Sequence, residues 1–199
     1  LLTRIKKDLE NDIPVRDMKL TEEEIKSLAN YQFLTGKPLL IVVNIGEEDL
    51  PKAEEMRKEF EAAFSKSRVA TICGKLESEL RQMDKKDADE LRKDYGLKES
   101  GLDSVLKLSY SLLGLISFLT AGADECRAWP IQEGTIAVKA AGKIHSDIER
   151  GFIRAETVSY EDLIAAGTMA EAKKRGTFRS EGKTYVVKDG DVINFLFNV

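Results

Sequence analysis

The sequence predicts an α/β segment with helices before it and a separate small α+β domain after it. Residues 39–83 alternate strand and helix patterns twice, which is the order of crossover units in a parallel sheet. From residue 115 onward the apolar segments are short and separated by turn residues, which is typical of a small mixed domain. Ahead of both, residues 2–34 carry two stretches of helical periodicity.

Length and composition are those of a folded protein with one or two domains. The chain has 199 residues, of which 42% are hydrophobic, enough to bury a sizeable core. Its net charge is −4, so the whole molecule does not attract polyanions, although a local basic patch could.

No apolar run approaches the roughly 18–20 residues that span a bilayer, and we expect a cytoplasmic protein without a membrane partner. Cys73 and Cys126 stand alone, without the spacing of a zinc site or a disulfide framework.

Two helices are expected before the first strand. The first is predicted by apolar residues at helical spacing, namely Leu2, Ile5 and Leu9, and should end near Asn11 because Pro14 opposes a helix. Thr21 and Glu24 have the spacing of a capping box, which predicts that a second helix begins there and runs towards Leu34. Because helical periodicity starts at the first residues, we expect a fragment of a longer protein.

The α/β segment is predicted from two aliphatic strands. Leu39–Val43 is a continuous apolar run, the pattern of a strand buried on both faces in a parallel sheet, and Arg68–Ile72 is a second strand. A helix beginning near Pro51 connects them. Leu76 and Leu80 predict a helix after the second strand, and residues 84–112 are expected to be largely helical.

Five short strands are expected in the C-terminal domain: Leu115–Thr120, Arg127–Ile131, Phe152–Val158, Tyr185–Val187 and Val192–Phe197. Asp189-Gly190 predicts a hairpin between the last two of them. Short helices are expected at Thr135–Lys143 and Tyr160–Ala165. Together these elements form an α+β domain of about 85 residues.

Two loops at the carboxyl ends of the aliphatic strands form the first candidate site, because open α/β sheets bind ligands there. The Asn44 amide offers a donor and an acceptor to the edge of a purine, and Glu47 could accept from an exocyclic amine. An asparagine that only satisfies local backbone is the competing interpretation. In the second loop, Cys73-Gly74-Lys75, the missing side chain of Gly74 lets a backbone amide approach a base.

The chain resembles a known family at these loops and throughout its C-terminal third. Thr35–Glu47 is similar to the strand and NxxE motif that replaces the guanine-reading NKxD in the YchF, or Obg-like ATPase, family. Ile72-Cys73-Gly74 resembles the family's base-contact loop. Further segments resemble the family's TGS domain, among them Arg127-Ala128-Trp129, Glu149–Glu156 and Asp189–Ile193. The sequence departs from the family pattern at Gly46, Pro130 and Ile148.

The resemblance covers the whole chain and implies its fold class. The implied class is an α/β remnant of the G domain of a P-loop NTPase with a helical segment, followed by an α+β TGS domain of β-grasp type. Residues 1–32 would be the tail of a helical, coiled-coil insertion. Residues 33–112 would be the C-terminal part of the G domain, and 113–199 the TGS domain.

The resemblance further implies a site for ATP or GTP with magnesium. Its base-binding residues would be Asn44, Ile45, Glu47, Cys73 and Gly74. Replacing the NKxD aspartate by Glu47 removes geometry that rejects adenine, which favours ATP over GTP. The magnesium ligands and catalytic groups are expected in an N-terminal part of the parent protein, so no catalytic residue or metal ligand is predicted in this chain. We therefore expect the chain alone to be inactive as a hydrolase.

Family members associate with ribosomes, so the resemblance implies the ribosome, ribosomal RNA or translation factors as partners. The candidate RNA contacts are basic residues: Arg150, Arg154, Lys173, Lys174 and Arg175. A solvated helix end is an equally good interpretation of the last three. A stand-alone TGS-type module that binds RNA or protein without a nucleotide role remains the alternative function. Trp129 and His145 are interpreted as structural.

Overall fold

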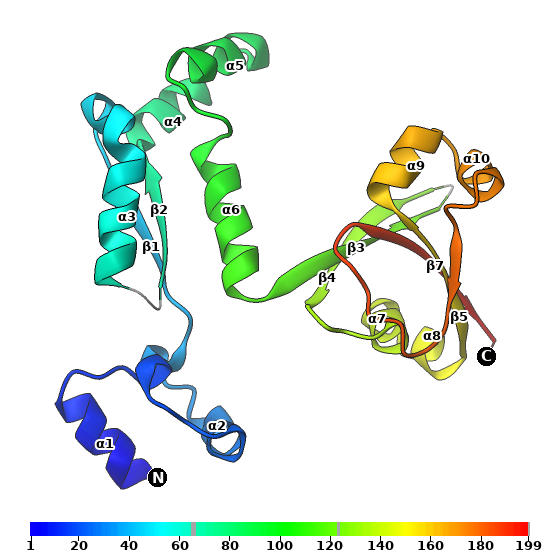
Figure 1. The fold of residues 1–199 in the computed structure, drawn as a ribbon, viewed down its shortest axis with the longest axis horizontal. Helices are drawn as coiled ribbons and strands as arrows, with labels where there is room; N and C mark the ends of the chain where they lie inside the picture. The colour runs from blue at the N-terminus through cyan, green and yellow to red at the C-terminus, as the bar shows by residue number, and fades with distance from the viewer. Residues whose placement is uncertain (65–66, 123, 199) are drawn as a thin grey trace. The chain divides into compact units, whose positions relative to one another are not determined.

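The computed structural model describes residues 1–64, 67–122 and 124–198. The chain forms two compact units, Leu1–Leu112 and Leu113–Val199 (Figure 1). Separate groups of buried apolar side chains stabilise each of them. No helix in the described part of the chain is long and apolar enough to cross a membrane.

The first unit begins with α1 (Leu2–Glu10) and α2 (Glu22–Leu28), which pack around Ile5, Val15 and Leu28. The predicted capping box is confirmed, because Glu24 N donates to Thr21 Oγ1 at 3.3 Å and Thr21 N donates to Glu24 Oε2 at 3.0 Å. α2 ends at Leu28, earlier than the predicted end near Leu34. A short 3-10 turn, Val15–Asp17, precedes α2. Two more follow it, Ala29–Tyr31 and Leu34–Gly36.

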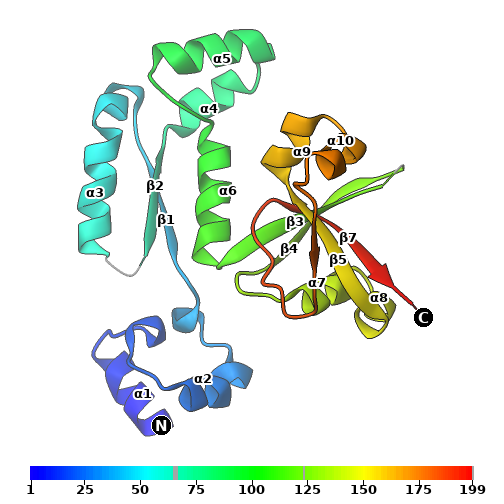
Figure 2. The ribbon, with the colours of Figure 1, turned by 45° about the vertical axis from the view of Figure 1, so that its right-hand side comes forward.

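A parallel pair of strands, β1 (Leu40–Asn44) and β2 (Arg68–Ile72), forms the centre of the first unit. A 3-10 turn and a helix connect them, Glu47–Lys52 and α3 (Ala53–Ala63). Three helices follow β2, namely α4 (Gly74–Leu80), α5 (Lys85–Asp94) and α6 (Gly101–Leu112). Figures 1 and 2 show α3 and α6 on either side of the strand pair.

The expectation that β1 is buried on both faces is wrong. The Val42 side chain is 41% exposed, and only one edge of the strand is paired within the described residues. Ile45 and Cys73, at the carboxyl ends of the two strands, are nevertheless buried with Leu76, Leu80 and Ala88. The loops that follow the strands are therefore anchored in the core of the unit.

The second unit is built on a five-stranded sheet in the order β4-β3-β7-β5-β6 (Figure 2). β3 and β7 are parallel, and the other neighbouring pairs are antiparallel. Its strands are β3 (Leu115–Ala121), β4 (Cys126–Gln132), β5 (Phe152–Ser159), β6 (Arg179–Glu181) and β7 (Asp191–Phe197). Pro130 lies in β4, an edge strand, where a residue without an N–H is tolerated.

Helices cover both faces of this sheet. α7 (Ala137–Ile144) and α8 (Ser146–Arg150) pack on the face that includes Ala155 of β5. α9 (Tyr160–Ala166) and α10 (Met169–Lys174) pack on the opposite face, which includes Val158. His145 has a structural role, as predicted, because its Nδ1 accepts from Asp147 N at 3.1 Å and caps α8.

The predicted strand Tyr185–Val187 and its hairpin are wrong. This segment makes only an isolated bridge between Val186 and Ile136, while β7 pairs with β3 and β5. A turn does form at Asp189-Gly190, with φ of 76° at Gly190, but it is bound to β3. Ser117 N donates to Asp189 Oδ1 at 2.8 Å and Gly190 N donates to Ser117 O at 2.9 Å. The three-residue strand β6 was not predicted.

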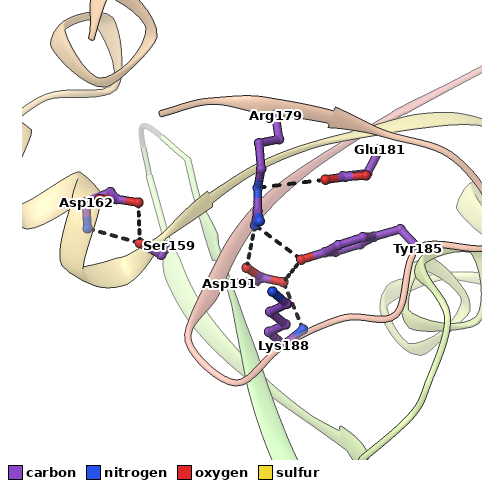
Figure 3. Close-up of polar contacts among 7 residues, drawn as sticks. All are labelled: Ser159, Asp162, Arg179, Glu181, Tyr185, Lys188 and Asp191. Carbon is purple, nitrogen blue, oxygen red and sulfur yellow. Dashed lines mark hydrogen bonds and ion pairs between the residues drawn. The ribbon is translucent and has the colours of Figure 1, made fainter. Parts of the chain in front are cut away.

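A buried carboxylate holds the segment between β6 and β7 in place (Figure 3). Asp191 is only 2% exposed and accepts hydrogen bonds from Tyr185 OH at 2.7 Å, Lys188 N at 2.9 Å and Arg179 Nη2 at 3.3 Å. These three donors compensate for the burial of the charge. Burial of the ring, and then its hydrogen bond to Asp191, raise the pKa of Tyr185 to about 12.

We expect the free energy of unfolding of Tyr185→Phe to fall less at alkaline pH than that of the wild type. In the folded state the pKa of Tyr185 is about 12, above the ordinary value of about 10. The stability that the protonated Tyr185 hydroxyl contributes is therefore complete below about pH 10 and is lost as the pH rises through about 12. Urea unfolding between about pH 8 and pH 11.5 measures it, with Tyr160→Phe at an exposed tyrosine as the control. The same alkaline loss in wild type and Tyr185→Phe would contradict this role.

Candidate functional site

The loops after β1 and β2 meet at one edge of the sheet because the strands are parallel and in register. Asn44, the last residue of β1, pairs with Ile72, the last residue of β2. Ile45 N then donates to Ile72 O at 2.8 Å and extends the pairing into the loops. The buried side chains of Ile45 and Cys73 fix each loop to the core. The backbone on both sides of the site is thus held in place.

The Asn44 amide connects the two loops directly. Gly74 N donates to Asn44 Oδ1 at 3.0 Å. A Cβ at position 74 would lie 3.2 Å from that oxygen, so glycine leaves room for this contact. Among the residues that the structure describes, the Nδ2 group of Asn44 has no partner and is free to donate to a ligand.

Glu47 supplies a carboxylate from the same loop. Lys75 Nζ donates to its Oε1 at 3.0 Å, and Tyr95 OH donates to its Oε2 at 3.5 Å. The hydrogen bond and ion pair with Glu47 raise the pKa of Lys75. An ionised carboxylate has about four acceptor positions, so Glu47 can still accept from a ligand amine.

A cavity of 350 Å³ lies between the two loops. It is lined by Asn44, Ile45, Gly46, Glu47, Glu48, Cys73 and Lys75. Small-molecule sites span about 300–1,000 Å³, so this volume suits one ring system with its first substituents. A free amide donor and a carboxylate acceptor on its wall match a purine edge that carries a ring nitrogen beside an exocyclic amine.

The sequence prediction and the structure overlap at most positions of this cavity. Of the five predicted base-binding residues, Asn44, Ile45, Glu47 and Cys73 line the cavity. The fifth, Gly74, contributes its N–H to Asn44 in this structure. Lys75, Glu48 and Tyr95 were not predicted as site residues. Lys75 could have been found, since it follows Gly74 directly, whereas nothing in the sequence indicates that Tyr95 reaches Glu47.

The five predicted RNA-contact residues do not all lie together. Arg154 and Lys173 both approach Glu156, at 3.9 and 3.3 Å. Arg175 donates to Ala165 O at 2.9 Å and pairs with Glu171 at 3.3 Å.

Lys174 is exposed in the last turn of α10. Arg150 pairs with Asp147 within α8, and α8 covers the opposite face of the sheet from α10. The structure therefore brings Arg154 and Lys173 together and places Arg150 on the other helix pair.

Metal ligands are not grouped in the described ranges. No cluster of three or more His, Cys, Asp or Glu side chains within residues 1–64, 67–122 and 124–198 is placed to hold a metal ion.

Comparison with known proteins gives consistent matches along the chain. Residues 115–198 match a family model described as "YchF-GTPase_C: Protein of unknown function". The whole chain is 46% identical to "Ribosome-binding ATPase YchF" of Bacillus subtilis and spans 56% of that protein. Over 99% of its length it is 41% identical to "Obg-like ATPase 1" of Caenorhabditis elegans, of which it spans 51%.

The fold also matches a solved structure. The structure of the Schizosaccharomyces pombe YchF GTPase superposes with a TM-score of 0.83 and 28% sequence identity, over 98% of this chain and 53% of that one. The chain thus spans about half the length of the curated relatives that it matches.

We expect Asn44→Ala to loosen the contact between the two loops. Without the Oδ1 acceptor, the Gly74 amide should exchange its hydrogen about fivefold faster, because a hydrogen bond of about 1 kcal/mol is lost. Amide exchange followed by NMR on residues 1–199 measures this. Asn11→Ala removes a surface amide that donates to Lys7 O and serves as the control. Equal Gly74 exchange in all three proteins would show that Asn44 does not hold the loops together.

Proposed function

The chain belongs to the YchF family, and from this premise we propose that it supplies the base-reading part of a nucleotide-binding protein that associates with ribosomes. The observation that carries the proposal is the hydrogen bond between Gly74 N and Asn44 Oδ1. It joins the two loops around the cavity and leaves the Asn44 donors free. Relatives named as ribosome-binding ATPases support the second part of the proposal and a cytoplasmic location.

The proposed ligand of the first unit is ATP or GTP, bound with magnesium in the complete protein. Asn44 Nδ2 would donate to a ring nitrogen of the base, and Glu47 would accept from the exocyclic amine. Ile45 and Cys73 anchor the loops, and Gly74 fixes the Asn44 amide. The phosphates, the metal and the reaction would be served by other parts of the protein.

Lys75 bears on the preference between the two nucleotides. Its ammonium lies 3.0 Å from Glu47 Oε1 and lines the cavity, so a carbonyl oxygen of a base would be attracted there and an amine repelled. Glu47 alone favours the adenine amine. We therefore propose that ATP is preferred and that Lys75 allows GTP to bind as well.

The second unit is proposed to be a TGS domain of β-grasp type that contacts the ribosome. Supporting this are the antiparallel β3–β4 pair, the parallel neighbours β3 and β7, and helices on the sheet. The domain map we propose is 1–32 for the end of a helical insertion, 33–112 for part of a G domain and 113–199 for TGS. The proposed RNA contacts are Arg150, Arg154, Lys173, Lys174 and Arg175.

A stand-alone RNA- or protein-binding module without a nucleotide role is not favoured. The relatives named as ATPases match the first unit as well as the second, since they cover 99–100% of the chain. The cavity between the loops would also be without a role in such a module.

In the full-length protein, Asn44→Ala should weaken binding of both ATP and GTP by about 1–3 kcal/mol, roughly 5- to 150-fold, because a buried base edge loses its partner. Isothermal titration calorimetry measures the affinities, and inorganic tripolyphosphate tests whether the phosphate contacts are intact. Asn11→Ala is the matched control. Unchanged affinity for both nucleotides would rule out Asn44 as a base-reading residue.

Ribosome binding should depend on the basic end of α10. We expect the combined change of Lys173, Lys174 and Arg175 to alanine to weaken co-sedimentation with ribosomes and to flatten its salt dependence, because counterion release is lost. The matched control replaces three exposed lysines of α5 in the first unit, Lys85, Lys86 and Lys93, by alanine. Binding that ignores both the three substitutions and the salt concentration would contradict a basic RNA contact.

A further inference from the structure

A second cavity, of 240 Å³, opens on the sheet face of the second unit that α9 and α10 partly cover. Its apolar wall includes Met169, Phe178 and Val192. Its polar wall is formed by Glu156, Lys173 and Asn194. We propose that this cavity binds one unpaired base of a single RNA strand.

The polar groups of the cavity come from three elements that the fold brings together. Glu156 of β5 and Asn194 of β7 are direct cross-strand neighbours, so both side chains lie on the same face of the sheet. Lys173 of α10 reaches Glu156 Oε2 at 3.3 Å, and Arg154 approaches Glu156 Oε1 at 3.9 Å. A carboxylate, an amide and the Lys173 ammonium therefore line one opening, and the Arg154 guanidinium approaches the same carboxylate.

Each of these groups matches a part of a nucleotide in a single strand. The Phe178 ring offers a surface on which a base can stack. Glu156 can accept from an exocyclic amine, and the Asn194 amide can both donate and accept at the base edge. The Asn194 side chain is exposed and has no hydrogen-bond partner among the residues described. Arg154 and Lys173 suit the flanking phosphates.

The Lys173 ammonium lies over the face of the Phe178 ring on which a base would stack, with Nζ 5.1 Å from the ring centroid. Its side chain is exposed, and exposed ion pairs contribute little, so moving the ammonium to a phosphate costs little. The base then replaces it on the ring, and Glu156 is released to accept from the base. The same movement supplies the stacking surface and the phosphate contact.

Size and charge select this occupant over others. At 240 Å³ the cavity is below the range of about 300–1,000 Å³ that encloses larger ligands, so it admits a single ring system and not a whole nucleoside triphosphate. Two cations share one carboxylate, and Lys174 adds a further positive charge nearby. An acidic protein segment would use the cations but would leave the Phe178 ring and the Asn194 amide without a function. The inference rests on the proposed ribosome contact only for the identity of the strand as RNA.

Fluorescence anisotropy with residues 1–199 tests the proposal. The probes are a labelled single-stranded RNA of about eight nucleotides and an abasic oligonucleotide of the same length, which keeps the phosphates and lacks the bases. We expect the RNA to bind about tenfold more tightly than the abasic strand. Asn194→Ala and the conservative Phe178→Leu should each bring the two affinities together. Lys143→Ala, at an exposed lysine of α7, should leave the difference unchanged.

Equal affinity of the wild-type chain for the two oligonucleotides would overturn the proposal, because charge alone would then explain binding. A preference for the RNA that survives both Asn194→Ala and Phe178→Leu would overturn it as well. A chain that binds no RNA but still co-sediments with ribosomes would refute the base pocket and indicate a protein contact. A chain that does neither would also contradict the ribosome contact proposed above.

Discussion

The parallel pairing of β1 with β2 is the constraint on which the first unit and its site depend. It pairs Asn44 with Ile72, the last residues of the two strands, so that the loops after the strands begin side by side at the same edge of the sheet. The Gly74 N–H then reaches the Asn44 amide at 3.0 Å, and Ile45 and Cys73 anchor both loops in the core. Only after this backbone is fixed do Asn44 and Glu47 stand on one cavity wall. A shift in the register of the two strands would separate these groups.

The second unit depends on the buried carboxylate of Asp191 as well as on strand register. Asp191 is shielded from water and satisfied by Arg179, Tyr185 and the Lys188 backbone. Burying an ionised group is tolerated only with such partners, so this network fixes how the segment after β6 returns to β7 (Figure 3). With β7 in place, its neighbour β5 presents Glu156 beside Asn194. The polar face of the second cavity follows from that pairing.

The sequence predicted the parts of the fold whose cause is local. Aliphatic runs and capping residues located β1, β2 and the start of α2, because periodicity and hydrogen-bond chemistry act within a few residues. It failed where the partner is distant: Asp189-Gly190 forms a turn bound to Ser117, not a hairpin, and β6 is too short to leave a pattern. One cavity is lined by four of the five residues that were predicted to contact a base. The contact of Tyr95 with Glu47, in contrast, depends on tertiary structure that no local pattern encodes.

Photoaffinity labelling is the most direct test of a base site shared by the two loops. The full-length protein would be irradiated with an azidoadenosine triphosphate, whose reactive group is on the base, and the adducts mapped by mass spectrometry. We expect saturable labelling, prevented by excess ATP, in peptides that contain residues 44–48 and 73–75. Saturable labelling confined to other peptides would show that the base is bound elsewhere and that the cavity between the loops is not its site.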